Sequence, residues 1–480
     1  MAMLAERRGG RVARWVLIAV AVVGLTQLIW HSQVLAFAPD GLHDLAAIYG
    51  PARAWLEGLD PYSGEAVEQV LREAGYDGIV LRYKRSMLGV YPPITYAAMA
   101  PIAAMNWRAA SITWTALSLA GVGVLIAQCV WLLRRTADIT QNPNPRLRER
   151  LPLDVLAVVA AVLALAPFHT SLRLGQTSIV ALVLTLGAFI AVLGARQMLA
   201  GVLAGLAFAL KPQMGIVAGA YFVTRMHGRA VGFTLLTAGA LYLVGWAQVA
   251  ANAPQWQEQL QRNLQVFNEG GYGDPTMAGR FRHHLLSLHV LLHMLIEDRK
   301  AVTVLTVAFG AVVTLLAMGC MAGRRTCARQ ELAFFSVLAV ACLLTAPGHR
   351  FYNAMLLLVP MVYGLSLLWR GMDGRTVTRA DRLRAAALLA PVVSFVVPTS
   401  SALYVLGLQG YIPAALMDNI VWHGLLMPLH VWTLLLLLAL LLWYMRLPDG
   451  MAVATPQEDQ TGTADQSVSP SVGGTLETGS

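Results

Sequence analysis

The chain has 480 residues, of which 57% are hydrophobic and only 13% are charged, and its formal net charge is +9. Soluble domains contain roughly 45–50% apolar and about 25% charged residues, and this chain repeats apolar runs of about 20 residues, the length of a membrane span. The composition therefore excludes a soluble enzyme and indicates a polytopic membrane protein. The positive charge lies in short loops between the apolar runs, which is typical of membrane topology and argues against a nucleic-acid partner.

Ten apolar runs are long enough to be candidate spans. They are 14–36, 109–133, 152–168, 177–194, 230–251, 301–322, 331–347, 352–369, 385–407 and 424–445. An eleventh stretch, 199–224, is interrupted by Lys211-Pro212; two short arms turning there would keep the basic clusters on one side of the membrane. Such a break is tolerated only where it lines a protein cavity. We therefore predict an all-α polytopic membrane protein with about 12 spans, including a short broken hairpin.

The spans form one predicted membrane domain, 1–447, and the polar segment 448–480 has the composition of a disordered tail. The basic clusters place both termini in the cytoplasm. They also predict the main external loops at about 37–107, 169–176 and 252–300. The segment "YPPITYAAMAPIAAMNW" inside the first loop is too short and too interrupted to cross. We expect it to lie on the outer leaflet or to dip into it.

Asp44 lies in "HDLAAIYGPARAWLEGLDPY", where the chain leaves the first apolar run. One interpretation is a general base at the membrane surface that takes the proton of an acceptor hydroxyl. The other is a surface acid that caps the following helix, since Asp favours helix starts. We expect this helix to end at Gly58 and Asp60-Pro61 to turn the chain away from the bilayer.

Three cationic residues are candidate phosphate ligands. Lys211 is costly in an apolar stretch and so indicates function, although it would also fit a lysine that reaches the interface beside a proline kink. Arg173 in the loop "FHTSLRLGQTS" and Arg350 in "PGHRFYN" lie on the side that disfavours basic residues. The planar fork of Arg binds two phosphate oxygens. The alternative for both is a solvated loop charge or an interfacial anchor.

The loop 252–300 places His289, His293 and Glu297 at a spacing that is able to ligate zinc. We favour an amphipathic helix on the bilayer, with the histidines on its wet side, so no metal and no other cofactor is predicted. The sequence has no phosphate-binding P-loop and no dinucleotide-binding glycine motif. Its spans are nearly free of Asp and Glu, which ion-coupled transporters need.

Four stretches follow one another along the chain: "YGPARAWLEGLDPY", "YPPITYAAMAPIAAM", "LGQTSIVALVLTLGAF" and "AGVLAGLAFALKPQMGIV". From about Asp44 to Tyr363 this ordered set resembles glycosyltransferase family 87, a branch of the C-type, polyprenyl-phosphate-dependent glycosyltransferases. The resemblance implies a C-type glycosyltransferase fold, with juxtamembrane helices in the first external loop, and a sugar carried on polyprenyl phosphate, typically mannose. By position, Asp44 matches the family's catalytic acid, Lys211 its lysine before proline, and Gln176 its "G-Q" glutamine.

The implied reaction needs a base for the acceptor hydroxyl, Asp44, and cations for the departing phosphate. Lys211, Arg173 and Arg350 are the candidate cations, and the candidate substrate-binding residues are Gln176, His349, Tyr91 and Tyr352. The implied partners are a polyprenyl-phosphate-linked sugar donor, a glycan, lipid or protein acceptor, and the bilayer of the cell inner membrane. The active site would face the periplasm or exterior. Transfer of another sugar, such as arabinofuranose, and a flippase or transporter of lipid-linked sugars remain open alternatives.

Overall fold

The computed structural model describes residues 14–29, 42–78, 89–136, 145–279, 281–322, 327–368, 379–397, 399–417, 419 and 421–446. Within these ranges the regular elements are helices, and one isolated antiparallel bridge joins Leu285 to Arg350. The all-α class predicted from the sequence is confirmed. The tail predicted at 448–480 lies outside the described residues.

A first helix covers Arg14–Ile29. The next helices share a small hydrophobic core. They are α2 (His43–Leu56), α3 (Gly64–Glu73), α5 (Pro93–Ala103) and the long α6 (Trp107–Thr136). The Trp107 ring packs edge-on against Tyr49 and Tyr76, with centroids 5.4 and 4.8 Å apart. As the sequence predicts, α2 is followed by Gly58 at φ 74°, and Asp60 Oδ1 accepts a 2.9 Å hydrogen bond from Tyr62 N–H. These contacts fix α2 relative to the start of α6.

The next two helices correct one expectation. Helix α7 (Pro145–Ala164) bends by 55° into α8 (Ala166–Leu174), with Pro167 in the first turn of α8. Proline favours that position because the first helical N–H groups have no partner. The short loop expected at 169–176 is therefore mostly helix, and only residues 175–177 connect α8 to α9 (Ser178–Leu193).

Lys211 separates two helices, as its sequence position indicates. Helix α10 (Gln197–Leu210) ends there and α11 (Pro212–Thr224) begins, while Lys211 itself is extended, with φ −154° and ψ 90°. Pro212 has no N–H to donate to a continuing helix. The Lys211-Pro212 sequence therefore accounts for the break between α10 and α11.

The direction of α12 (Gly228–Asn252) shows that this break is a hairpin. A Cβ on Gly201 would lie 2.5 Å from the Ala230 carbonyl oxygen, and one on Gly205 would lie 2.7 Å from Thr237 Cβ. Residue numbers therefore increase in the same direction along the contact between α10 and α12, so the two helices run parallel to each other. Helix α11 must return the chain between them, which confirms the two short arms.

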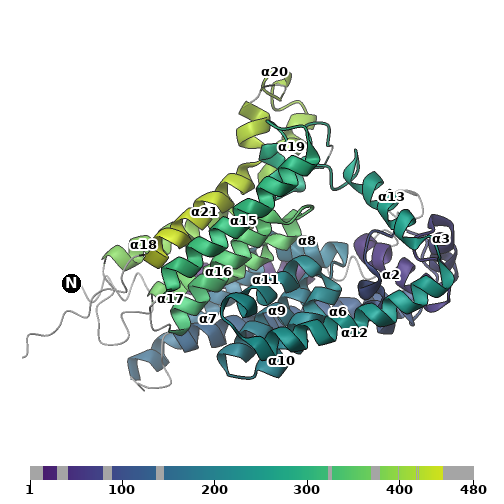
Figure 1. Ribbon diagram of the computed structural model, residues 1–480. Helices are drawn as coiled ribbons and strands as arrows, with labels where there is room; N and C mark the ends of the chain where they lie inside the picture. The colour runs from purple at the N-terminus through teal and green to yellow at the C-terminus, as the bar shows by residue number, and fades with distance from the viewer. Residues whose placement is uncertain are drawn as a thin grey trace, which may run out of the picture. The chain divides into compact units, whose positions relative to one another are not determined.

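The second half is also helical. Its elements are α13 (Trp256–Asn268), η2 (Arg282–His284), α14 (His289–Leu292), α15 (Arg299–Met321), α16 (Ala328–Thr345), η3 (Phe351–Leu357), α17 (Leu358–Leu368), α18 (Arg379–Val393), η5 (Ser394–Val396), α19 (Thr399–Leu408), α20 (Ala414–Met417), the π-helix η6 (Trp422–Leu426) and α21 (Leu429–Arg446). Figure 1 shows α15, α16 and α21 running alongside one another.

Two further expectations are wrong. The span expected at 385–407 is divided, because Val397 is extended between η5 and α19; a residue that precedes a proline, here Pro398, is disfavoured in a helix. The amphipathic helix expected around His289 and His293 is also missing. Helix α14 covers four residues, and both histidines are buried. Backbone hydrogen bonds from Leu286 N to His349 O and from Leu288 N to Leu344 O join this segment to the end of α16 and the turn after it.

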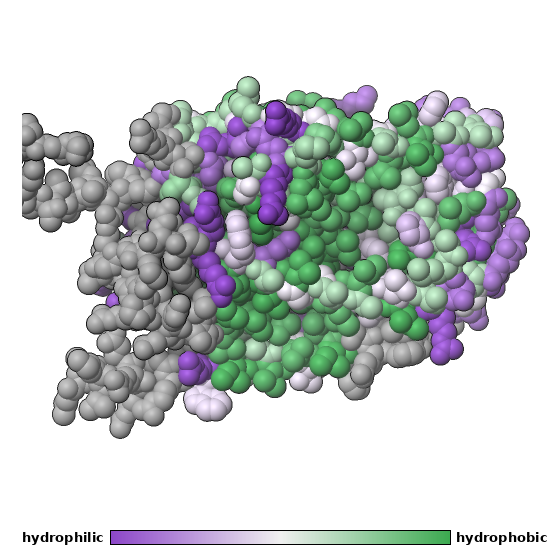
Figure 2. Space-filling view, turned by 90° about the horizontal axis from the view of Figure 1, so that it is seen from below, coloured by the Kyte–Doolittle hydropathy of each residue, from purple (hydrophilic) through white to green (hydrophobic). Residues whose placement is uncertain are grey.

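Six helices among the described residues are long and apolar enough to cross a membrane, or seven if the bent pair α7–α8 counts as one span. Several apolar helices are shorter, including α9 and α10, so the count of about 12 spans stays a prediction. Figure 2 shows apolar side chains over the middle of one face and polar ones toward its ends. Leu235, Leu236 and Leu243 of α12 are 60–68% exposed, which suits a lipid-facing helix. The protein is a multi-pass membrane protein.

Candidate functional site

The turn after α8 brings Gln176 to the start of α2. Gly175 has φ 69°, and its carbonyl oxygen accepts a 3.0 Å hydrogen bond from Trp114 Nε1. A Cβ at this glycine would come within 2.8 Å of Leu45 Cβ. Glycine is needed both for the left-handed backbone and for the close approach of α2. The following residue, Gln176, thereby lies against the first turn of α2.

Asp44 belongs to this contact and does not cap its helix. The cap position is Leu42, which provides no side-chain cap, while Asp44 Oδ2 accepts a hydrogen bond from Gln176 Nε2. The second oxygen, Oδ1, is 3.6 Å from His43 Nε2, and the Asp44 side chain is 18% exposed. One carboxylate oxygen is thus held by Gln176, and the other lies near His43, whose side chain is 41% exposed.

Lys211 completes the cluster from the opposite side. It is 6% exposed, and Nζ donates hydrogen bonds to Gln176 Oε1 at 3.1 Å and to Ser178 Oγ. Its ammonium also lies 4.5 Å from the centroid of the Tyr352 ring. This lysine does not reach toward an interface; it is held inside the protein. Gln176 joins it to Asp44, donating to the acid and accepting from the cation.

Two residues that were not among the predicted site residues support this cluster. Ser178 accepts from Lys211 and donates to Asn353 Oδ1 at 3.1 Å. Ser178 is the first residue of α9, and Asn353 belongs to η3. The "G-Q-T-S" sequence contained the signal for Ser178, since it follows Gln176 by two residues. The partner Asn353 is remote in sequence and appears only in the fold.

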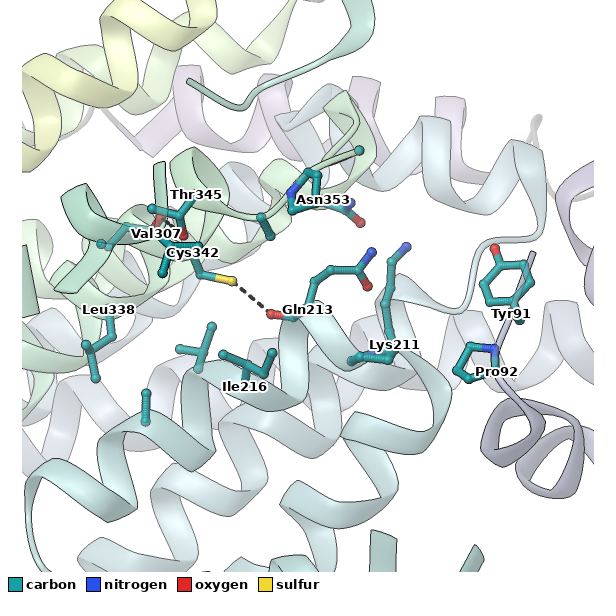
Figure 3. Close-up of a pocket in the computed structure, with 18 of the residues that line it drawn as sticks. Tyr91, Pro92, Lys211, Gln213, Ile216, Val307, Leu338, Cys342, Thr345 and Asn353 are labelled. Atoms are coloured by element: carbon teal, nitrogen blue, oxygen red, sulfur yellow. Dashed lines mark hydrogen bonds between the residues drawn. The ribbon is translucent and has the colours of Figure 1, made fainter. Parts of the chain in front are cut away.

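A cavity of about 760 Å³ opens beside Lys211. Figure 3 shows Lys211 and Gln213 rising in the same direction from the start of α11, with Tyr91 to one side. The polar lining comprises Tyr91, Lys211, Gln213, Asn268, Thr314, Thr345, Tyr352 and Asn353. Three of the candidates predicted from the sequence, Tyr91, Lys211 and Tyr352, therefore share one cavity.

The rest of the cavity is an apolar groove between α11, α15 and α16. Its walls include Ile216, Val217, Val307, Leu338 and Ala341. Ile216 is 51% exposed and Val307 is 62% exposed, so the groove opens along the side of the protein. In Figure 3, Leu338 and Val307 lie on the side of Lys211 away from Tyr91. One cavity thus joins a buried cation to a trough of hydrocarbon side chains.

Arg350 lies over two aromatic rings, outside the cavity lining. Its guanidinium lies 4.8 Å from the Tyr272 ring centroid and 5.9 Å from that of Phe267, and Nη2 donates to Tyr272 O at 3.2 Å. Tyr272 also stacks on Phe281, with centroids 4.2 Å apart. A guanidinium over the face of an aromatic ring is attracted to it, so these contacts help to position Arg350. Tyr272 lies in the glycine-rich "EGGYGDP" stretch, which carried no motif by which to find it.

Asp274 fastens the loop that carries Tyr272. Its carboxylate accepts hydrogen bonds from the N–H groups of Gly270 at 2.8 Å and Thr276 at 3.0 Å, and it lies 3.5 Å from Arg299. Burial alone would raise the pKa of Asp274, but the two N–H groups and Arg299 outweigh it and hold the pKa below its usual value. The loop is therefore tied to the start of α15.

The remaining candidates are placed differently. His349 is fully buried, with Nε2 3.7 Å from Cys342 Sγ, and Cys342 lines the groove. Arg173 is exposed near the end of α8, lies outside the cavity lining and makes no hydrogen bond or ion pair with the described residues. The structure therefore does not bring Arg173 to the Lys211 cluster. Across the described ranges, no three His, Cys, Asp or Glu side chains gather closely enough to hold a metal ion.

The fold and the cavity define a multi-pass membrane protein in which a broken helix lines a polar site. A comparison with family models matches glycosyltransferase family 87 over residues 90–347, more than half of the chain. The chain belongs to this family and is a glycosyltransferase. The matched region contains Tyr91, Gln176 and Lys211, whereas Asp44 and Arg350 lie outside it. A comparison with curated proteins finds no match.

Proposed function

We propose that this glycosyltransferase moves a sugar, mannose being the first candidate, from a polyprenyl-phosphate carrier to an acceptor hydroxyl on the outer face of the inner membrane. The observation that carries the proposal is the chain of hydrogen bonds from Asp44 through Gln176 to Lys211, at the polar end of an apolar groove. An acid and a cation joined by one amide supply the two charges that glycosyl transfer needs. The groove supplies a place for a lipid.

In the proposed reaction, the acceptor oxygen attacks the anomeric carbon while the bond from that carbon to the phosphate oxygen breaks. The hydroxyl proton passes to Oδ1 of Asp44, the oxygen that Gln176 does not hold. The electron pair of the broken bond stays on the phosphate, which leaves with increased negative charge. Lys211 stabilises that charge, and Arg350, which lies outside the cavity lining, adds a second cation.

Gln176 has a positioning role in this scheme. Its terminal amide holds Asp44 Oδ2 through Nε2 and Lys211 Nζ through Oε1. The separation between base and cation is thereby set by the two ends of one carboxamide group. The base then acts on the acceptor side of the sugar and the cation on the leaving-group side, which in-line displacement at the anomeric carbon requires.

The apolar groove supports a polyprenyl donor. A phosphate beside Lys211 would leave its lipid tail to run along Ile216, Val307 and Leu338. Burying hydrocarbon there gains roughly 25 cal/mol per Å² removed from water, but a groove opening into lipid gains far less. The groove therefore serves mainly to align the tail and so to position the phosphate.

The test is to incubate the purified protein in lipid nanodiscs with radiolabelled polyprenyl-phosphate mannose and an extract of envelope glycans and lipids. Transfer of label that disappears in Asp44→Asn supports the proposal. A nucleotide sugar that serves as donor where the polyprenyl phosphate does not would overturn the donor class. Labelled donor that crosses the bilayer of reconstituted vesicles without being consumed would show a flippase instead. Polyprenyl-phosphate arabinofuranose, offered in parallel, decides the sugar.

A further inference from the structure

Asn353 has a side-chain amide of which the fold uses only the oxygen. Its Oδ1 accepts a 3.1 Å hydrogen bond from Ser178 Oγ, and its backbone N–H donates to Arg350 O at 2.8 Å. Its Nδ2 makes no hydrogen bond with the described residues. The residue as a whole is 1% exposed. An amide N–H group is thus left without a protein partner inside the fold, where an unsatisfied donor is costly.

The unused amide nitrogen of Asn353 is open to the cavity. Asn353 is one of the lining residues, and its Nδ2, although unpaired, is not sealed by the surrounding protein. Figure 3 shows the side chains of Lys211 and Gln213 rising toward Asn353. A ligand bound beside Lys211 therefore has access to this N–H group.

Ser178 brings the Asn353 amide next to the Lys211 ammonium. Its Oγ accepts from Lys211 Nζ and donates to Asn353 Oδ1, so that one hydroxyl bonds to both groups. An ammonium has donors only, so the serine must accept from it and is free to give its own hydrogen to the amide oxygen. Because the oxygen is held by Ser178, the nitrogen is the amide atom that remains for a ligand.

We propose that Asn353 is a further catalytic residue, whose Nδ2 donates a hydrogen bond to the phosphate of the lipid carrier beside Lys211. The inference rests on the proposed transfer from a polyprenyl phosphate. Two neighbouring groups that only donate need a ligand that only accepts, and the non-bridging oxygens of a phosphate accept several hydrogen bonds at once. A sugar hydroxyl suits this position less well, because its own hydrogen would face two donors.

The contribution of the amide is largest when the sugar leaves. As the bond from the anomeric carbon to the phosphate oxygen breaks, its electron pair stays on the phosphate, whose oxygens become more negative. A fixed N–H group at those oxygens forms a stronger hydrogen bond as the charge grows, and no proton is transferred to the phosphate. Ser178 and the Arg350 carbonyl hold Asn353 without any substrate, so the amide needs little reorganisation.

The experiment measures the binding of farnesyl phosphate, a short isoprenoid phosphate without the sugar, to the full chain in phosphate-free maltoside micelles. Farnesol, which has the same hydrocarbon without the charge, is the reference ligand. We expect Asn353→Leu to weaken the binding of farnesyl phosphate by about tenfold or more, because a hydrogen bond to a charged group is lost. The binding of farnesol should not change. An unchanged affinity for farnesyl phosphate would overturn the proposal.

Asn252→Leu is the matched control, because Asn252 is exposed and its Nδ2 bonds to Gln248 O in its own helix. This variant should keep the affinity for both ligands. Asn353→Ala removes the same N–H group without adding an apolar branch, and it tests the proposal if Asn353→Leu does not fold. Either Asn353 variant should also lower kcat for sugar transfer by roughly 10²-fold.

Ser178→Ala distinguishes a phosphate ligand from a structural strut. If Asn353 only tied η3 to α9, Ser178→Ala would cost at least as much affinity as Asn353→Leu, because it breaks the same bond and the bond to Lys211. We expect a smaller loss, since the Asn353 N–H group remains and Gln176 still holds Lys211. An equal or larger loss in Ser178→Ala would assign Asn353 a positioning role, and the proposal would be wrong.

The wild-type protein separates this inference from the proposed function. If it binds farnesyl phosphate no more tightly than farnesol, the lipid-phosphate donor is wrong, and the role of Asn353 is wrong with it. If it binds farnesyl phosphate tightly and Asn353→Leu keeps that affinity, the donor class stands and only the role of Asn353 is refuted.

Discussion

The two ends of the cavity are built by opposite means. The polar end is lined by Lys211 from a helix break and Asn353 from η3, and hydrogen bonds connect Lys211 to Gln176 in the turn before α9 and to Asp44 of α2, which lie behind the lining. Its members are joined by directed hydrogen bonds. The groove is made by the sides of three helices, and any apolar side chain of similar size would serve there. The polar end depends on hydrogen-bond distances near 3 Å, and the groove depends on the shape of its apolar walls.

This difference predicts how each end responds to substitution. A hydrogen-bonded cluster fails steeply, because a single missing atom leaves its partners buried and unsatisfied. An apolar groove fails gradually, because burial of hydrocarbon is non-directional and roughly proportional to area. Substitutions at the polar end should therefore lower kcat by orders of magnitude. Those in the groove should change KM, and only for donors long enough to fill it.

The largest effect is expected at Asp44. Asp44→Asn keeps the size of the side chain but removes the base, so kcat for sugar transfer should fall by about 10²–10⁴-fold. The assay is the initial rate with radiolabelled donor at saturation. Asp60→Asn is the matched control, since Asp60 only closes a turn by accepting from Tyr62 N–H. An Asp44→Asn enzyme that retains full kcat would remove Asp44 from the chemistry.

Lys211→Met tests the leaving-group side. The methionine fills a similar volume without charge, so kcat should fall by roughly 10²–10³-fold, as when one donor to a developing anion is removed. A donor with a better leaving group than phosphate monoester should recover part of the loss, because it needs less stabilisation. Equal losses with both donors would indicate that Lys211 supports the structure and not the departing phosphate.

Sequence reasoning reached Asp44, Gln176 and Lys211 but not the residues that support them. Lys211 stood out because a lysine before proline in an apolar run is costly, and the hairpin it predicted is present. Asp44 and Gln176 were indicated by resemblance, and the structure joins them. Ser178 and Asn353 were missed because a serine at a helix start and an asparagine in an apolar turn are ordinary residues. Their role comes only from contacts between segments 175 residues apart.

Other errors have a common cause. The stretch around His289 has helical periodicity, yet it folds as a short turn because backbone pairing with the segment near His349 competes with helix formation. Local pattern gives no information on such remote pairing. Arg173 was grouped with Lys211 by charge and side alone, and α8 instead leaves it exposed. The side of the membrane on which a residue lies therefore says less about its function than the cavity that it lines.

Substitution of Tyr272 should have an effect of intermediate size, because this ring orients the Arg350 guanidinium without belonging to the hydrogen-bonded cluster. Tyr272→Ala removes one ring from the Arg350 stack, and we expect KM for the donor to rise about tenfold, the size of one partly desolvated cation–π contact, with kcat little changed. Tyr272→Phe keeps the ring and should restore the normal KM. If both variants behave alike, the hydroxyl matters and the stacking explanation is wrong.

The smallest effect is expected in the groove. Ile216→Trp adds bulk to the wall beside α11, so KM should rise a few-fold for long polyprenyl donors, while short-chain donors that do not reach Ile216 should keep their KM. Leu235→Trp is the matched control, since Leu235 of α12 is 68% exposed and lies outside the cavity lining. Donors of increasing chain length are compared in the same nanodiscs. A KM increase that is independent of chain length would place the tail elsewhere, and the polar end alone would then carry donor recognition.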